Sequence, residues 1–333
     1  MIDFNKTFLN QEAKIYECPA DKIISLEDGS FLSIKGKEAS IYSKNFQLKF
    51  KLNFKNELAD VLQLKTNEIL LLIADYYANY LLLYDDKTFK LISKISDFHN
   101  ESAGVERMFE LSNSTLALCF SASYGINIFE RNNNDFKYLK TIDTKYCCYS
   151  ACEIDNSNIA YNCTFNYKCE EYDICFSHND KCIKDLFLTC SRDSLYFFRK
   201  KNLLLANGME CTYVIDLNKY ELINSFTIED QLFYHNDKTL CLIDDYIIIP
   251  GCKYKIFILK WNERNKKSEL INSFNFDDSI KVSEKEDDNL RWQFIQNSRL
   301  LFLNKKIYIY RIKGKIGEFN LFYEYILENL NMV

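Results

Sequence analysis

One short pattern recurs seven times along this chain. Each copy is an apolar residue, four mostly polar residues and an apolar run that begins five positions after the first residue. The first apolar residues of the copies, called the anchors below, are Leu26, Leu64, Leu111, Ile154, Phe198, Leu242 and Ile295. Successive anchors are 38 to 53 residues apart. A repeat of this period predicts an array of similar small units that bury their apolar faces against one another.

Each anchor belongs to a longer unit. A strand-like run ends 15 to 22 residues after the anchor, and most units then close with another run after a polar turn, as in DDKTFKLISKI. The first of these two runs ends at Tyr42, Tyr84, Phe129, Phe176, Ile215, Leu259 and Tyr310 in the seven units. One unit therefore reads strand, tight turn, strand, loop, strand, turn, strand. Four strands per unit is the composition of one β-propeller blade.

The residue types in the runs favour strands that are covered on both faces. Ile, Phe, Tyr and Leu dominate, and runs such as LLLIA and YIIIP are apolar at successive positions. The chain has 8 Gly and 2 Pro, so Asn, Asp and Ser must form most of the turns. Asn suits this role because it tolerates positive φ. Near the C-terminal end, FNLFYEYILENL has a pattern that also fits a helix.

From about Lys22 to Ile326 the units resemble the WD-repeat family of β-propellers. The match lies in the spacing and in closing aromatic and acidic pairs, Tyr84 with Asp85 and Phe129 with Glu130. The Gly-His and Trp-Asp dipeptides of that family are absent, so the chain is similar to a divergent member. The resemblance implies an all-β fold, a seven-bladed β-propeller with four antiparallel strands per blade, in a single domain over residues 1–333.

The predicted blades lie near residues 20–55, 58–98, 105–144, 149–187, 188–230, 232–278 and 290–328. A propeller ring needs its first and last strands to meet in one blade, so that no sheet edge is left exposed. The segment 4–18 is apolar enough to supply a strand to the last blade. Alternatively, FNLFYEYI from Phe319 completes that blade from its own side. Both alternatives remain open from the sequence.

Composition limits the classes of function. With 47% hydrophobic residues the chain is not disordered, and a net charge of -5 argues against a nucleic-acid binder. Basic pairs such as Lys200–Lys201 are interspersed with acids and form no stripe. No window reaches the apolar length of a membrane span, and the first residues lack the apolar run of a secretory signal. We expect a cytoplasmic chain, with the nucleus as the alternative, without membrane insertion or direct nucleic-acid binding.

Cysteine forms the densest group of chemically active residues. With His178 among them, these are Cys147, Cys148, Cys152, Cys163, Cys169, Cys175, Cys182 and Cys190. Structural zinc usually takes closely spaced pairs such as C-x2-C, and no C-x2-C occurs here. We therefore predict reduced thiols that fill the fourth blade, with no metal and no cofactor. A zinc site is the alternative.

Signatures of catalysis are absent from the sequence. The three histidines, His99, His178 and His235, lie in polar segments that are typical of turns, and a catalytic His needs an orienting carboxylate and a nucleophile. None of the motifs G-x-S-x-G, G-x-G-x-x-G, Walker A or H-E-x-x-H occurs. The acidic stretch Phe276–Arg291 predicts a solvated loop, with a docking loop for a basic partner as the alternative.

Tyrosines mark the predicted binding surface. Loops that join the second and third strands of equivalent blades emerge at one end of the ring, and these loops carry Tyr76, Tyr77, Tyr124, Tyr167 and Tyr254. Rigid rings with a polar tip suit protein contacts. We expect a non-catalytic protein–protein interaction scaffold or adaptor, a subunit of a larger complex whose protein partner is unknown. The alternatives are a propeller enzyme, a hydrolase or lyase with its site at the mouth of the central channel, and a peptide reader.

Overall fold

A computed structural model describes residues 14–17, 22–74, 79–95, 105–120, 125–144, 147–155, 158–164, 172–178, 181–208, 211–227, 241–243, 246–250, 255–275, 298–303, 306–311 and 321–326. These residues are almost entirely β-strands, and their one helical element is the 3-10 turn η1 (Arg199–Lys201). Within this part of the chain, no helix has the length and apolar character needed to cross a membrane. The strands fall into two compact units, Asp21–Phe197 and the combination of Met1–Ala20 with Phe198–Val333.

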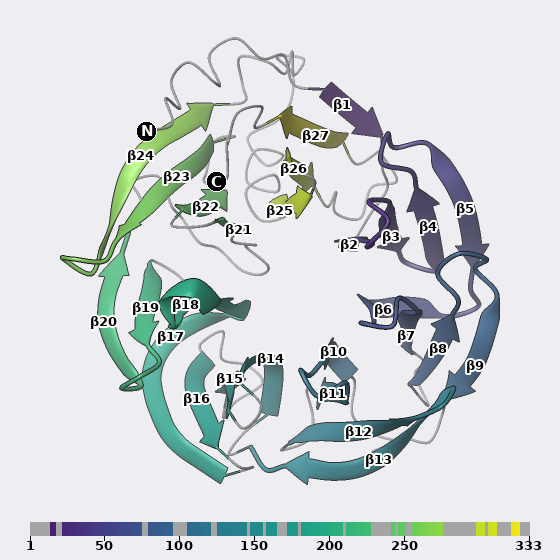
Figure 1. Ribbon diagram of the computed structural model, residues 1–333, viewed down its shortest axis with the longest axis horizontal. Coiled ribbons are helices and arrows are strands. Elements are labelled where there is room, and N and C mark those ends of the chain that lie inside the picture. Colours follow the sequence, from purple (N-terminus) through teal and green to yellow (C-terminus); the bar gives the residue numbers. More distant parts are fainter. Residues whose placement is uncertain are drawn as a thin grey trace. The chain divides into compact units, whose positions relative to one another are not determined.

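In the Asp21–Phe197 unit the strands follow one another from sheet to sheet in sequence order (Figure 1). The first sheet contains β2 (Lys22–Ser25), β3 (Phe31–Lys35), β4 (Glu38–Tyr42) and β5 (Leu48–Asn53). The second contains β6 (Glu57–Gln63), β7 (Ile69–Ala74), β8 (Tyr80–Tyr84) and β9 (Leu91–Ile95). The third contains β10 (Val105–Glu110), β11 (Leu116–Phe120), β12 (Ile126–Asn132) and β13 (Asp135–Ile142). The strands β14 (Cys147–Asp155), β15 (Asn158–Thr164), β16 (Tyr172–His178) and β17 (Lys181–Phe198) follow.

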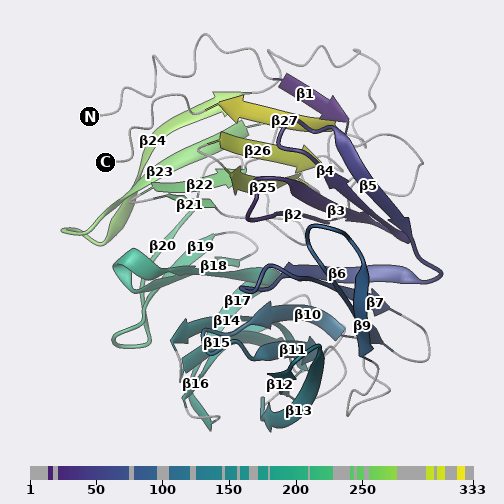
Figure 2. The same cartoon turned by 45° about the vertical axis from the view of Figure 1, so that its right-hand side comes forward.

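The other unit holds the remaining strands. They are β18 (Leu203–Gly208), β19 (Thr212–Asp216), β20 (Glu221–Phe226), β21 (Cys241–Ile243), β22 (Tyr246–Pro250), β23 (Lys255–Asn262), β24 (Lys267–Asn275), β25 (Ser298–Leu303), β26 (Lys306–Arg311), β27 (Leu321–Ile326) and β1 (Lys14–Glu17). Figure 2 shows β1 beside β27, which lies next to β26. Both terminal segments therefore complete the last sheet: β27 extends it after β26, and β1 pairs antiparallel with β27. The C-terminal segment that also fitted a helix contains strand β27 instead.

The prediction of seven separate blades is wrong for the described residues, which form six sheets. Five sheets have four strands each, and the sixth has seven, in the order β14 to β20. The physical reason is β17, which is 18 residues long. It pairs with β16 from Lys181 to Cys190 and then continues to the fifth anchor, Phe198. The predicted boundary between residues 187 and 188 thus falls inside one continuous strand. The all-β class and the four-stranded antiparallel sheets are confirmed.

The anchors begin the tight turns between the first and second strands. At the first anchor, the N–H of Leu26 donates to the carbonyl of Ser30 at 2.8 Å, and its carbonyl accepts the N–H of Gly29 at 2.9 Å. The same two bonds recur at the second and third anchors. The third residue after the anchor has positive φ in all three turns: Gly29 (80°), Asn67 (75°) and Ser114 (65°). Asn and Ser thus take the position that Gly would otherwise fill, as the composition predicts.

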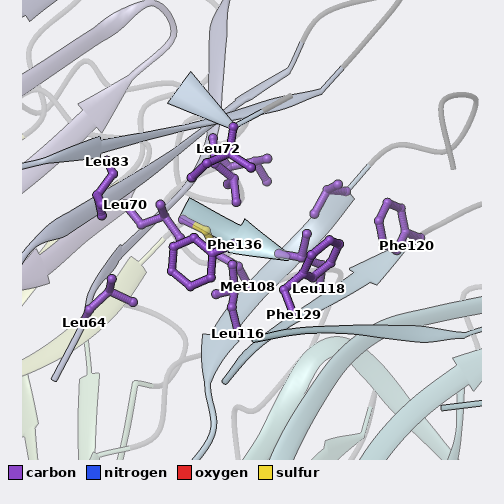
Figure 3. Close-up of a cluster of buried hydrophobic side chains, with 13 residues drawn as sticks. Leu64, Leu70, Leu72, Leu83, Met108, Leu116, Leu118, Phe120, Phe129 and Phe136 are labelled. Carbon is purple, nitrogen blue, oxygen red and sulfur yellow. The ribbon is translucent and has the colours of Figure 1, made fainter. Parts of the chain in front are cut away.

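In the second sheet the apolar run is buried on both faces, because this sheet packs between the first and the third sheets. In β7, Ile69, Leu71 and Ile73 belong to a cluster shared with the first sheet. Leu70 and Leu72 belong to a cluster shared with the third sheet, and Figure 3 shows them together with side chains of that sheet. Alternate residues of one strand therefore serve two interfaces. Full burial of each such side chain contributes about 1.5–3 kcal/mol.

A β-bulge recurs where the third and fourth strands pair. In six such pairs of the described residues, the register shifts by one residue within the third strand, for example between Leu83 and Tyr84. The extra residue on the outer strand bends it and interrupts the row of backbone groups at the sheet edge. The outer edges are therefore poor templates for the addition of another strand.

The turns between the third and fourth strands place large residues at positive φ. Phe46 (59°), Phe89 (54°), Tyr220 (53°) and Lys266 (55°) take this left-handed conformation. We expect Lys266→Gly to raise the free energy of unfolding by about 0.5–1 kcal/mol, because Gly adopts this φ without a steric cost. The Lys266 ammonium forms an exposed ion pair with Glu263, which contributes little to stability. Urea unfolding monitored by circular dichroism checks this.

The matched control is Phe46→Gly, at the same kind of φ but with a different outcome. The Phe46 ring is buried and stacks on Phe31 with 4.4 Å between ring centroids. Losing that packing outweighs the relief of backbone strain, so this variant is expected to be less stable than the parent by about 2 kcal/mol. A Lys266→Gly variant that is no more stable than the parent would contradict the assignment of backbone strain, and a stabilised Phe46→Gly variant would contradict the expected loss of packing.

Candidate functional site

The five predicted binding tyrosines lie outside the described residues. These are Tyr76, Tyr77, Tyr124, Tyr167 and Tyr254. The strand bounds place each of them between the second and third strands of its repeat: between β7 and β8, β11 and β12, β15 and β16, and β22 and β23. The tyrosine surface stays a prediction, and the described strand ends show how the bases of these loops are held.

The base of the loop that carries Tyr124 is closely packed. A Cβ on Gly125 would clash with the Cγ2 atom of Thr141, so a side chain at this position requires the Thr141 side chain to move. The hydroxyl of Thr141 donates to Oδ1 of the buried Asn127 at 2.7 Å and lies 2.8 Å from the hydroxyl of Tyr138. Buried polar contacts of this kind restrain the strand ends, because breaking them leaves unpaired groups. The loop therefore begins from a rigid support.

Four buried thiols lie together between the third sheet and strands β14–β16. They are Cys119 on β11, Cys148 on β14, Cys163 on β15 and Cys175 on β16, within one apolar cluster that also contains Tyr161. The Sγ atoms of Cys163 and Cys175 are 3.1 Å apart, and the described cysteines are free thiols. Cys119 was missed because it is 28 residues from the nearest cysteine of the sequence cluster. Its position in the all-buried strand β11 is the signal that finds it.

The chemistry of this thiol cluster is that of apolar packing. Burial raises the pKa of the Cys148 thiol well above its ordinary value, and the neighbouring thiols of Cys119, Cys163 and Cys175 raise it further. A protonated thiol is a poor nucleophile and a poor metal ligand. Among the described residues, no group of three or more His, Cys, Asp and Glu side chains has an arrangement that could hold a metal ion. Of the remaining predicted cysteines, Cys147 is buried, Cys152 is half-buried and Cys182 is exposed.

The raised pKa of Cys148 predicts a loss of stability in alkali. The folded state keeps the thiol proton above pH 9.0, the ordinary pKa, whereas the unfolded chain releases it. This contribution to stability is complete below pH 9.0 and declines as pH rises, by at most about 1.4 kcal/mol per pH unit. Urea unfolding between pH 8 and 10 should show the decline, and Cys148→Ala should reduce its slope. The exposed Cys182→Ala is the control, and equal slopes in all three proteins would contradict the prediction.

One of the three histidines, His178, lies in the described part of the chain. His178 is exposed at the end of β16, and its Nδ1 lies 2.8 Å from Oδ1 of Asn158. This pair links two neighbouring strands next to a turn. His99, His235, Cys169 and the acidic stretch Phe276–Arg291 lie outside the described residues.

One buried carboxylate joins three sheets. Asp60 on β6 is 2% exposed. Its Oδ1 forms an ion pair with Nζ of Lys22 on β2 and accepts the N–H of Val61 at 2.9 Å. Its Oδ2 accepts the N–H of Met108 on β10 at 2.9 Å. Both oxygens are thus engaged by the protein itself, which indicates a structural role. The sequence analysis did not identify Asp60. The signal that could have identified it is an acidic residue in the middle of the strand sequence ELADVLQ.

Three equivalent hydrogen bonds also connect neighbouring sheets of this unit. In each, the residue just before one anchor accepts the backbone N–H of the residue just after the preceding anchor. The pairs are Glu27 N–H to Gln63 Oε1 at 2.8 Å, Lys65 N–H to Glu110 Oε2 at 2.6 Å, and Ser112 N–H to Glu153 Oε2 at 2.7 Å. The sequence signal for these bonds is a Glu or Gln immediately before an anchor. It can be recognised only when the anchors are known to begin turns.

Comparisons with known proteins bear on the fold. No protein-family model and no curated protein sequence matches this chain. Among solved structures, a complex of BBS1N with ARL6DN is similar at 9% identity and a TM-score of 0.65, with 97% of this chain and 98% of that chain covered. The Dos1 propeller is similar at 10% identity and a TM-score of 0.60, with 88% of this chain and 75% of that chain covered.

An enzyme is also among the similar structures. It is the dihydro-heme d1 dehydrogenase NirN in complex with DHE, with 10% identity, a TM-score of 0.61 and coverage of 88% of this chain. This chain spans 61% of the length of that structure. Identities this low show the fold alone. The similar structures are β-propellers, and the four-stranded antiparallel sheets of this chain fit propeller blades.

Proposed function

We propose that this chain is a non-catalytic protein–protein interaction scaffold or adaptor, a divergent WD-repeat-like propeller that acts as a cytoplasmic subunit of a larger complex. The observation that carries the proposal is the use of its buried ionisable groups. Asp60 accepts bonds from three directions, and the Cys148 thiol is held protonated in an apolar cluster. These groups hold neighbouring sheets together, which favours a rigid support over an active site.

The loops between the second and third strands are the surface that such a support would present. Gly125 and the bonds among Asn127, Thr141 and Tyr138 restrain the base of one of these loops. A restrained loop loses less conformational entropy on binding, and tyrosine supplies contact area at a small entropic cost. The similarity to BBS1N in complex with ARL6DN supports the proposal, because a propeller of nearly the same extent binds another protein there.

The test is quantitative affinity purification of the tagged chain from its native cells, with chemical crosslinking. We expect at least one protein to co-purify in a fixed ratio. The triple variant Tyr76→Ser, Tyr77→Ser and Tyr124→Ser should reduce the amount of that protein about tenfold or more, since aromatic residues dominate interface energies. The control Tyr220→Ser changes a tyrosine in the turn between β19 and β20 and should leave the ratio unchanged.

Two outcomes would contradict the proposal. One is purification of the chain without a stoichiometric protein partner. The other is a partner whose ratio is the same in the parent and in the triple variant, which would place binding away from the tyrosine loops. Circular dichroism of the purified variants shows whether a lost partner reflects lost folding.

A further inference from the structure

The outer strands of the first two sheets each carry an exposed apolar side chain on the face that is turned toward the other sheet. Phe50 on β5 pairs with Ile41, whose side chain packs toward the second sheet. Leu91 on β9 pairs with Tyr84, whose side chain packs toward the first sheet. Both side chains therefore face the interface between the two sheets, and they remain 44% and 53% exposed. We call Phe50, Leu91 and Lys94 with their supporting rings the β5–β9 seam.

A row of aromatic rings supports this seam. Phe50 stacks on the buried Phe89 with 5.7 Å between ring centroids, and Phe89 stacks on Tyr84 at 6.1 Å. Tyr84 in turn makes an edge-to-face contact with Phe54, with 6.5 Å between ring centroids. Offset and edge-to-face contacts of this kind hold each ring in place. The exposed face of Phe50 is therefore presented by a rigid support.

At the corresponding outer positions, the interface between the second and third sheets carries hydroxyl groups. By register, Ser93 on β9 takes the place of Phe50, and Tyr138 on β13 takes the place of Leu91. The hydroxyl of Ser93 donates to the carbonyl of Asn134, and the hydroxyl of Tyr138 lies 2.8 Å from that of Thr141. The repeat thus accepts polar, internally bonded residues at these positions. Of these two interfaces, the one between the first and second sheets carries the exposed apolar pair.

Lysine is the only charged residue type on the two outer strands of the seam. The strands β5 (LKFKLN) and β9 (LISKI) carry Lys49, Lys51 and Lys94 and no acidic residue, in a chain whose net charge is -5. Lys49 and Lys51 pair with Asp28 and Glu38. Lys94 lies opposite Leu82 and therefore on the seam, where its Nζ is 4.1 Å from the centroid of the Tyr80 ring. A carboxylate of a partner would find this cation beside the apolar pair.

We propose that the β5–β9 seam binds a segment of a partner protein that presents apolar side chains next to an acidic one. The apolar side chains pack on Phe50 and Leu91, and the carboxylate pairs with Lys94. The bulges in β5 and β9 disfavour strand addition, so the partner contacts side chains rather than the edge backbone. This surface is separate from the tyrosine loops, and the inference does not depend on them.

The probe is a library of random peptides displayed on phage and selected against the immobilised full-length chain. We expect selected peptides to be enriched in Asp or Glu next to large apolar residues, and their binding to weaken with salt because Lys94 contributes. Phe50→Ser and Leu91→Ser should each weaken binding about tenfold or more. Lys94→Glu should weaken the binding of acidic peptides, and selection against this variant should enrich basic peptides instead.

The control is Leu139→Ser, which changes a side chain on β13 that is 50% exposed and lies away from the seam. This variant should bind the selected peptides as the parent does. Leu91→Ser and Lys94→Glu change exposed groups, so they test the seam even if Phe50→Ser folds poorly. Selected peptides without acidic residues would overturn the proposal, as would peptide binding that the seam variants leave unchanged. Self-association of the chain that Leu91→Ser abolishes would also overturn it, because the occupant would then be a second copy.

Discussion

Replacement of Asp60 with alanine is expected to lower the free energy of unfolding of the Asp21–Phe197 unit by about 3 kcal/mol. The carboxylate is buried and accepts bonds from Lys22, Val61 and Met108, which lie on the first strands of three consecutive sheets. Alanine leaves the Met108 N–H without its acceptor and the Lys22 ammonium without its counter-charge. Unpaired buried donors cost about 1–3 kcal/mol each, so the loss is large. Urea unfolding at neutral pH measures it.

Two comparisons separate this effect from the loss of any acid. Asp28→Ala removes a carboxylate that is itself exposed and accepts bonds from Ser30 of the same turn, and it should cost less than about 1 kcal/mol. Asp60→Leu combined with Lys22→Met should be less destabilising than the sum of the two single changes, because the pair is removed together. Additive effects, or a cost of Asp60→Ala no greater than that of Asp28→Ala, would show that the carboxylate does not join the sheets.

The strands and tight turns could be predicted from the sequence because each follows from local residue types. Ile69 to Ile73 form an unbroken apolar run, and the structure divides that run between two interfaces by simple alternation. The turn positions follow from chemistry as well, since Asn67 and Ser114 replace Gly29 at positive φ in equivalent turns. Both features depend on residues close together in the chain, which a single sequence displays.

The number of sheets could not be predicted in the same way. The anchor pattern marks turns, and Phe198 is followed by a turn as expected, but nothing in the pattern shows where a strand should break before it. The bulges could not be predicted from the sequence either, because they arise from the pairing of two strands. Residues as different as Lys49, Ile92 and Leu139 are the extra residue in three of them. The repeat is conserved here in backbone geometry rather than in residue type.

The chemically important contacts were the least predictable, because they join residues that are distant in the chain. Asp60 accepts a hydrogen bond from Met108, which is 48 positions away in the chain. Cys119 contacts the thiols of β14–β16 only because two sheets pack together. The sequence cluster of cysteines did predict buried thiols in this region. It could not distinguish Cys148, which is buried, from Cys182, which is exposed, because both lie in segments of similar polarity.

The double variant Ile15→Pro and Tyr16→Pro is expected to destabilise the last sheet by about 3 kcal/mol. Strand β1 pairs with β27 from Lys14–Glu324 to Glu17–Leu321. In an antiparallel pair, adjacent residues direct their backbone groups to opposite sides, so one of the two prolines must remove an N–H that points at β27. Hydrogen exchange measured by mass spectrometry should show loss of protection in residues 321–326, which would then form an exposed edge.

Addition of the strand in trans separates pairing with β27 from general destabilisation. A chain that begins at Asp21 should unfold at lower urea concentration than the parent, and a synthetic peptide of residues 1–20 should restore its stability in proportion to peptide concentration. The same peptide with the two prolines should not, because it cannot complete the ladder. If the parent and the proline variant protect residues 321–326 equally, β1 does not complete this sheet. If both peptides restore stability equally, the contribution of residues 1–20 comes from contacts other than backbone pairing, because the prolines change that pairing and leave the charged residues intact.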